Sequence, residues 1–252
     1  MQGLPERKRD QLDTLLCSVL AAHGGLDRWQ NTKTLTAHVS LGGPFWASKG
    51  WPGVLSKQTL EIDTHREHLV YTPFTAPDRR SVFDVDPERL TILDTDGHII
   101  ESRTDLRASF DGYDHSTRWD AAQVAYFSSY ATWNYLTEPF LFTYQGVEAH
   151  EIEPWQEEGQ TWRRLKVTFP DTIVTHSQEQ TFYYDAEGMQ RRMDYIVDIN
   201  GSVEIAHYSS DFKTFDGFVF PTHRLVHYRH PDNTADRGVA SITIDIQDIT
   251  VK

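Results

Sequence analysis

The sequence is constrained most by short runs of β-branched and aromatic residues that tight-turn signals separate. In the C-terminal half three such signals follow one another, at residues 185–188, at Asn200-Gly201 and at Asp216-Gly217. Asn-Gly and Asp-Gly pairs accept the positive φ angles that two-residue hairpins need. The pattern predicts four consecutive antiparallel strands within residues 164–252, and a meander of short strands within residues 55–103.

Two segments interrupt this pattern and predict helices. Residues 12–20 carry apolar side chains at the spacing of one helical stripe, and Gly24-Gly25 supplies a stop. Residues 120–137 carry aromatic side chains on one helical face, with Asp120 as the expected N-cap. The sequence contains no internal repeat or linker-like segment. We therefore expect residues 1–252 to fold as a single, mainly β domain of the α+β class.

The acidic composition excludes some partners. The chain carries 37 Asp and Glu against 24 Lys and Arg, a formal net charge of -13. Phosphate backbones are bound by clustered Lys and Arg, so the composition argues against nucleic acid and disfavours an anionic membrane surface. Cys17 is the only cysteine, so no intrachain disulfide can form. The N-terminal segment has neither a continuous apolar region nor a small-residue cleavage site, and we expect a cytoplasmic protein without membrane insertion.

The sequence also predicts neither a metal nor a cofactor. His223, His227 and His230 are close in sequence, but on a strand the first two lie about 13 Å apart and His230 points to the other side. The motifs of zincins, α/β-hydrolases, P-loop NTPases and dinucleotide-binding proteins are absent from the sequence. We therefore expect that side chains alone provide the chemistry or the binding.

Two-residue hairpins fix which side chains lie beside one another across a sheet. We expect the turns at 200–201 and 216–217 to place Asp194 opposite His207 and Ser209 opposite Arg224. The turn at 185–188 would bring Glu179 beside Asp194. One sheet face would then carry a charged patch, made of Glu179, Arg192, Asp194, His207 and Arg224. The other face would carry aromatic and amide side chains, among them Gln178, Phe182, Tyr195 and Tyr208.

Each of these faces admits two interpretations, and only one face can be concave. The charged patch fits an acid/base site, because a carboxylate beside an imidazole fixes its tautomer and holds its pKa near neutrality. It also fits a solvated face on which opposite charges stabilise strand pairing. The aromatic face fits a pocket wall or an ordinary core. His176, near the start of a strand, is either an acid, base or ligand contact or a satisfied edge histidine.

Three stretches carry a family resemblance: HGGLDRWQNTKTL, FPDTIVTHSQEQTFYYDAEGMQRRMDYIVD and DGFVFPTHRLV. With the long helix before the second half, they resemble the LolA/LolB-like lipoprotein-carrier fold. The resemblance implies a curved antiparallel half-barrel sheet lidded by helices, with an apolar or lipid-like ligand on its concave side. The fold is also similar to that of a violacein-pathway enzyme, which implies that a member with a polar aromatic pocket can be an enzyme. The irregular residues 42–53 predict a mobile flap.

Two functions remain open for this sequence. The first is a cofactor-independent enzyme of the lyase, hydratase, isomerase or cyclase type, with acid/base residues His176, Glu179, Asp194, Tyr195 and His207. Arg192 and Arg224 would stabilise an anionic group or intermediate. The second is a non-catalytic carrier or sensor of an apolar ligand. In either case a small, partly apolar ligand would contact Tyr126, Tyr130, Trp133, Gln178, Phe182 and Tyr208.

Overall fold

The computed structural model describes residues 12–252, so the first eleven residues of the expected 1–252 domain lie outside the described residues. The described chain forms one antiparallel sheet of 13 strands, in the spatial order β6-β5-β4-β3-β2-β1-β13-β12-β11-β10-β9-β8-β7. The strands are β1 (Thr34–Gly42), β2 (Gln58–Asp63), β3 (His68–Thr72), β4 (Arg79–Val85), β5 (Glu88–Asp94), β6 (Ile99–Arg103), β7 (Glu148–Glu157), β8 (Gln160–Thr168), β9 (Glu179–Tyr184), β10 (Gln190–Val197), β11 (Val203–Phe215), β12 (Phe218–Tyr228) and β13 (Ile242–Val251).

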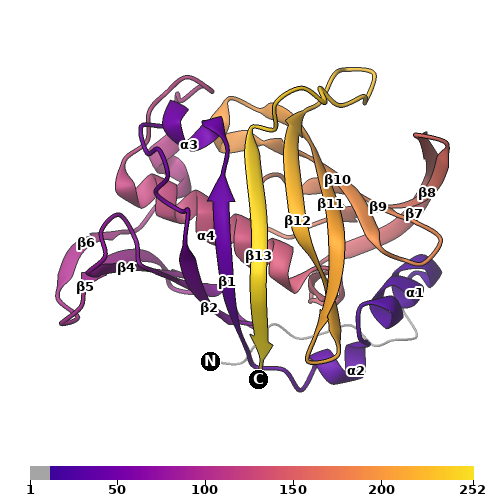
Figure 1. The fold of residues 1–252 in the computed structure, drawn as a ribbon, viewed down its shortest axis with the longest axis horizontal. Helices are drawn as coiled ribbons and strands as arrows, with labels where there is room; N and C mark the ends of the chain where they lie inside the picture. The colour runs from indigo at the N-terminus through magenta and orange to yellow at the C-terminus, as the bar shows by residue number, and fades with distance from the viewer. Residues whose placement is uncertain (1–11) are drawn as a thin grey trace.

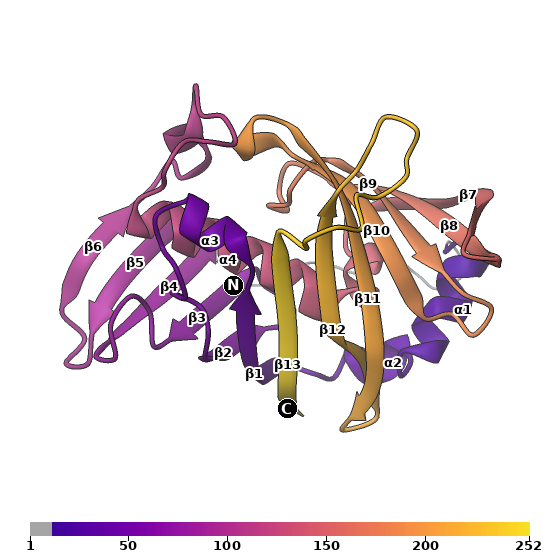
Figure 2. The same cartoon turned by 45° about the horizontal axis from the view of Figure 1, so that its top comes forward.

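The last strand joins the two halves of the sheet. Strand β1 pairs with β2 on one side and with β13 on the other, so the C-terminal strand lies in the middle of the molecule (Figure 1). The two edges are β6 and β7, and the sheet is not closed into a barrel. Figure 2 shows that the sheet curves around a central helix. The predicted fold, a curved antiparallel half-barrel with helices against it, is confirmed.

The helices differ in what they cover. They are α1 (Thr14–Ala22), α2 (Leu26–Trp29), α3 (Pro44–Ser48), α4 (Ala121–Thr137) and the 3-10 helices η2 (Arg107–Phe110), η3 (Phe140–Thr143) and η4 (Asp198–Asn200). Helix α1 packs near β7 and β8, α3 lies at one end of β1 and β13, and α4 crosses the hollow of the sheet (Figure 2). Among the described residues, no helix has the length and apolarity that crossing a bilayer requires.

Helix α4 is buried along almost its whole length, because all its residues after Ala121 lie in the interior. A helix buried on every side must carry apolar or hydrogen-bonded side chains all round. Its start is fixed by a capping box in which Asp120 accepts from the Gln123 backbone at 2.9 Å and Gln123 accepts from the Asp120 backbone at 3.0 Å. The predicted helix at residues 120–137 and its cap are confirmed.

The predicted register is correct for one hairpin. Strands β11 and β12 turn at Asp216-Gly217, so Ser209 pairs with Arg224, as expected, and His207 pairs with Val226. The β10–β11 connection is longer than a two-residue turn, because η4 and the left-handed Gly201 and Ser202 occupy residues 198–202. Val197 therefore pairs with Val203.

The predicted pairing of Asp194 with His207 is wrong by one residue, and a slip of one residue turns every side chain to the other face. Asp194 pairs with Ala206, and His207 pairs with Met193. A bulge between Gln190 and Arg192 also shifts β10 against β9, so Asp194 lies opposite Thr181 rather than Glu179. The expected charged patch is thus divided between the two faces of the sheet.

Glycine is required at one close contact between α1 and the β11–β12 hairpin. Gly24 has φ +120°, and a Cβ there would lie 2.7 Å from the Gly217 carbonyl oxygen and 2.8 Å from Phe218 Cδ1. Its neighbour Gly25 has φ +92°, and a Cβ there would meet no atom within 4 Å. The two positions thus share backbone strain but differ in available space.

We predict that Gly24→Ala destabilises the protein more than Gly25→Ala. Both variants carry the left-handed backbone cost of about 1–2 kcal/mol. Only Gly24→Ala adds overpacking, which typically costs about 1–3 kcal/mol. Urea unfolding followed by circular dichroism measures the difference, and equal losses in the two variants would contradict the close contact.

Candidate functional site

An apolar niche lies on the concave face between α3, α4 and strands β10 to β13. We call this feature the niche, and its lining residues are Phe45, Phe127, Tyr195, Val197, Asn200, Val203, Ile205, Val226, Tyr228, Ser241 and Ile242. The space open to a water-sized sphere is about 20 Å³, which is about enough for one water molecule. A larger ligand can enter only if the surrounding segments move apart.

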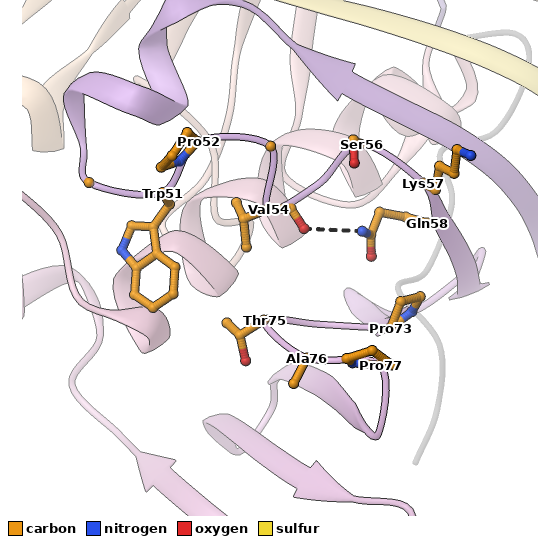
Figure 3. Close-up of a pocket in the computed structure, with 12 residues that line it drawn as sticks. Trp51, Pro52, Val54, Ser56, Lys57, Gln58, Pro73, Thr75, Ala76 and Pro77 are labelled. Atoms are coloured by element: carbon orange, nitrogen blue, oxygen red, sulfur yellow. Dashed lines mark hydrogen bonds between the residues drawn. The ribbon is translucent and has the colours of Figure 1, made fainter.

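Several larger hollows lie at the surface, and two of them contain residues of the predicted flap or predicted ligand contacts. The first, of about 430 Å³, separates residues 50–58 from residues 73–77, and Lys57 is its only charged lining residue. Figure 3 shows Trp51 and Val54 on one side of this groove and Thr75 and Ala76 on the other. The second, of about 390 Å³, is a polar cleft that contains Arg107, Asp198 and the predicted ligand contact Gln178. Neither surface hollow offers the aliphatic lining of the niche.

A network of tyrosines and histidines lies beneath the niche. The His176 ring stacks on the ring of Tyr195, with centroids 4.2 Å apart and planes 7° apart. Its Nδ1 hydrogen-bonds with the Tyr130 hydroxyl at 3.1 Å and its Nε2 with the Tyr135 hydroxyl at 2.7 Å. The Tyr195 hydroxyl hydrogen-bonds with Tyr135 at 3.1 Å and with Nδ1 of His207 at 3.4 Å. Tyr195 connects the network to the niche, because it belongs to both.

The network is uncharged at neutral pH. Burial, with a smaller effect of the Arg107 charge, lowers the pKa of His176 to about 3. Burial and then the Arg224 charge hold the pKa of His207 well below its ordinary value. Burial also raises the pKa of Tyr195 above its ordinary range. A general base works best with a pKa near the working pH, so neither histidine is tuned for proton abstraction at neutral pH.

Arg192 and Asp194 lie together on the convex face, away from the niche. They form a two-point ion pair, with Nε to Oδ1 at 2.6 Å and Nη2 to Oδ2 at 2.8 Å. Arg192 also donates to Glu157 at 2.8 Å and to the Asn233 carbonyl at 2.7 Å. The predicted ligand contact Tyr208 packs in this outer cluster and donates to Glu157. These contacts fasten the β12–β13 loop to the convex face of the sheet.

The other predicted residues are distributed differently from the expectation. Glu179 is a surface residue, because its side chain is 63% exposed and pairs with Lys166 at 2.8 Å. Phe182 packs against Phe142 in the core, and the Trp133 indole donates to the Asp63 carbonyl. Of the predicted contacts on α4, Tyr130 joins the network and Tyr126 lies at the polar cleft. The predicted residues therefore do not form one site.

Arg224 lies on the concave face, one layer deeper than the niche. Its Nη2 donates to the Tyr135 carbonyl at 3.1 Å and lies 3.9 Å from the Glu138 carboxylate. Both side chains are 2% exposed. Burial raises the pKa of Glu138 to about 7, although the Arg224 charge opposes this shift. Of the predicted catalytic residues, the structure brings together His176, Tyr195, His207 and Arg224.

Sequence reasoning missed Phe127 as a niche residue and missed Tyr135 and Glu138 in the polar interior. Tyr135 lies off the aromatic stripe that predicts one apolar face on α4. Glu138 follows the helix and precedes Pro139, so its position indicates only a helix end. The available signal was the presence of aromatic side chains all round this helix, which indicates burial on every side.

Lys49 holds the segments that cover the niche. Its fully buried ammonium donates to the His115 carbonyl at 2.8 Å, the Thr117 carbonyl at 3.2 Å and Oδ1 of Asn200 at 2.6 Å. Burial lowers its pKa to about 8. Residues 42–53, predicted as a flap, are thereby fastened to the 111–119 loop and to η4. We call Lys49 with these three acceptors the Lys49 latch.

Comparison with known proteins finds similar solved structures. No family model and no curated protein matches the chain. A solved LolA superfamily protein from Nitrosomonas europaea is similar at 10% identity over 93% of this chain and 92% of its own, with a TM-score of 0.42. A DUF1329 family protein from Desulfovibrio piger is similar at 12% identity over 95% and 93%, with a TM-score of 0.48. The predicted resemblance to the LolA/LolB-like fold is confirmed, and at these values it concerns the fold alone.

We predict that the buried His176 makes the protein sensitive to acid. Between its ordinary pKa of 6.5 and the folded value of about 3, the unfolded chain binds a proton that the folded chain does not. Stability is therefore lost as the pH falls below 6.5. Between pH 7.5 and 5, wild type should lose about 2 kcal/mol relative to His176→Gln.

Urea unfolding at several pH values measures this difference. His150→Gln, at an exposed histidine, is the control and should follow wild type. Parallel curves for wild type and His176→Gln would show that His176 is not held neutral by the fold.

Proposed function

We propose that this protein binds a small, partly apolar molecule in the niche, as a carrier or sensor that leaves the ligand unchanged. The observation that carries the proposal is the aliphatic niche above an uncharged polar network. The wall of Val197, Val203, Ile205, Val226 and Ile242 offers apolar surface, and Tyr195 offers a hydroxyl near it. This is the ligand class that the resemblance to the LolA/LolB-like fold implies.

Ligand entry requires that the Lys49 latch opens, because the closed niche holds about one water molecule. The latch joins residues that are distant in sequence, and a few hydrogen bonds hold it. Each hydrogen bond to a charged donor contributes about 1.5–3 kcal/mol, which burial of a few apolar groups of a ligand offsets. A ligand thus gains access when its apolar contacts with the niche replace the hydrogen bonds of the latch, which are of comparable energy.

An acid/base enzyme is the second candidate, and one observation favours it. Tyr195 lines the niche and its hydroxyl joins a network with two histidines. Incubation of a recovered ligand with the protein separates the two functions. Recovery of the ligand unchanged supports a carrier or sensor, whereas a product whose formation is lost in Tyr195→Phe supports an enzyme.

We predict that filling the niche weakens binding of apolar ligands. Val203→Trp places a bulky side chain in the niche, whereas Val219→Trp alters another half-buried strand valine that does not line it. Titration calorimetry with dodecanoic acid and dodecan-1-ol should show binding at least tenfold weaker for Val203→Trp and unchanged within about twofold for Val219→Trp.

Native mass spectrometry of protein purified from its own host complements this titration by detecting a retained ligand. Equal affinity in Val203→Trp and wild type would place the ligand outside the niche. Failure of wild type to bind any apolar probe, with no retained ligand, would overturn the proposed function.

A further inference from the structure

The concave face changes from apolar to polar with depth. Successive inward residues on β11 are Ile205, His207 and Ser209, and on β12 they are Val226 and Arg224. Ile205 and Val226 line the niche, and the next residue on each strand lies about 7 Å deeper, at about 3.3 Å per residue. The layer next to the niche along these two strands is therefore polar.

Several side chains around Arg224 leave hydrogen-bonding atoms unused. Within residues 12–252, Nε and Nη1 of Arg224 have no hydrogen-bond partner. The same holds for Oε2 of Glu138, the Tyr184 hydroxyl, Nε2 of His207 and Oγ of Ser209. We call these five residues the Arg224 cluster.

The residues of the Arg224 cluster are close to one another. Ser209 pairs with Arg224 across the β11–β12 hairpin. The Arg224 charge acts on His207 and Tyr184, and the Glu138 carboxylate lies 3.9 Å from its guanidinium. That distance exceeds the roughly 2.7–2.9 Å of a charge-assisted hydrogen bond. Arg224 is thus a buried cation with an incomplete partner.

A folded protein rarely leaves so many buried polar atoms unpaired in one region. Each costs about 1–3 kcal/mol, and a buried charge costs more. The unused atoms of Arg224 only donate, whereas Oε2 of Glu138 is an acceptor when ionised. The hydroxyls can do either. The cluster is therefore best satisfied by a group with several acceptor oxygens.

We propose that the Arg224 cluster receives an anionic oxygen headgroup, such as a carboxylate, of a ligand whose apolar body fills the niche. This inference rests on the proposed function and specifies its ligand class. The headgroup accepts from Nε and Nη1 of Arg224 and from the Tyr184 and Ser209 hydroxyls. Proton uptake by Glu138 removes the repulsion between its carboxylate and the arriving anion. The ligand enters with its headgroup first, because the polar layer is deeper than the apolar one.

Four amphiphiles with twelve carbons in the chain test this inference: dodecanoate, dodecyl phosphate, dodecan-1-ol and dodecyltrimethylammonium. Titration calorimetry of wild type should show that at least one anion binds tenfold or more tightly than the alcohol. The ranking of dodecanoate against dodecyl phosphate identifies the headgroup. In Arg224→Met the preference for the anion over the alcohol should disappear.

Tyr184→Phe provides a milder test, because it removes one hydroxyl and keeps the ring. It should weaken anion binding about threefold or more, and weaken anion binding more than alcohol binding. Arg224→Lys should retain part of the preference. Equal binding of anion and alcohol by wild type, tighter binding of the cation, or a preference that persists in both Arg224→Met and Tyr184→Phe would overturn the inference. Binding of none of the four would overturn the proposed function as well.

Discussion

The burial of α4 inside the half-barrel is the constraint on which the remaining structure depends. An open sheet that curves around a helix buries its concave apolar face against that helix. The helix must then present apolar or hydrogen-bonded side chains in every direction. Helix α4 does so with aromatic residues, whose hydroxyls need partners in the interior. The partners of Tyr130 and Tyr135 are His176 and Tyr195, so the packing of α4 itself produces the polar network.

The electrostatic state of that network bears on function. Its imidazoles are neutral, and the stacking of His176 on Tyr195 keeps both rings in fixed positions. A neutral, preorganised network offers hydrogen bonds without the cost of moving a charge into the interior. These properties suit recognition of a polar group better than abstraction of a proton. For the proposed ligand, the aliphatic wall above the network would add affinity in proportion to the apolar area that it buries.

The sequence predicts the fold better than the site, for physical reasons. Hairpin turns and helix caps are local, so the Asp216-Gly217 turn and the Asp120 cap could be recognised directly. The site depends on register, and one extra turn around η4 reverses the faces of Asp194 and His207. The bulge after Gln190 has no distinctive sequence. Contacts between distant segments, such as those of Lys49, leave no local pattern at all.

The two buried arginines of the sheet differ in how completely their donors are used, and this difference is the reason that the proposed binding role falls on the concave face. Arg192 on the convex face is paired with Asp194 at 2.6 Å and with Glu157 at 2.8 Å, and a loop carbonyl takes a further donor. Arg224 on the concave face has the same chemistry and similar burial, but its nearest carboxylate oxygen, on Glu138, is 3.9 Å away. A saturated arginine has no donor left for a ligand. Of these two arginines, Arg224 alone combines burial, unused donors and a position below the apolar niche, and this combination is why we propose it, rather than Arg192, as a binding group.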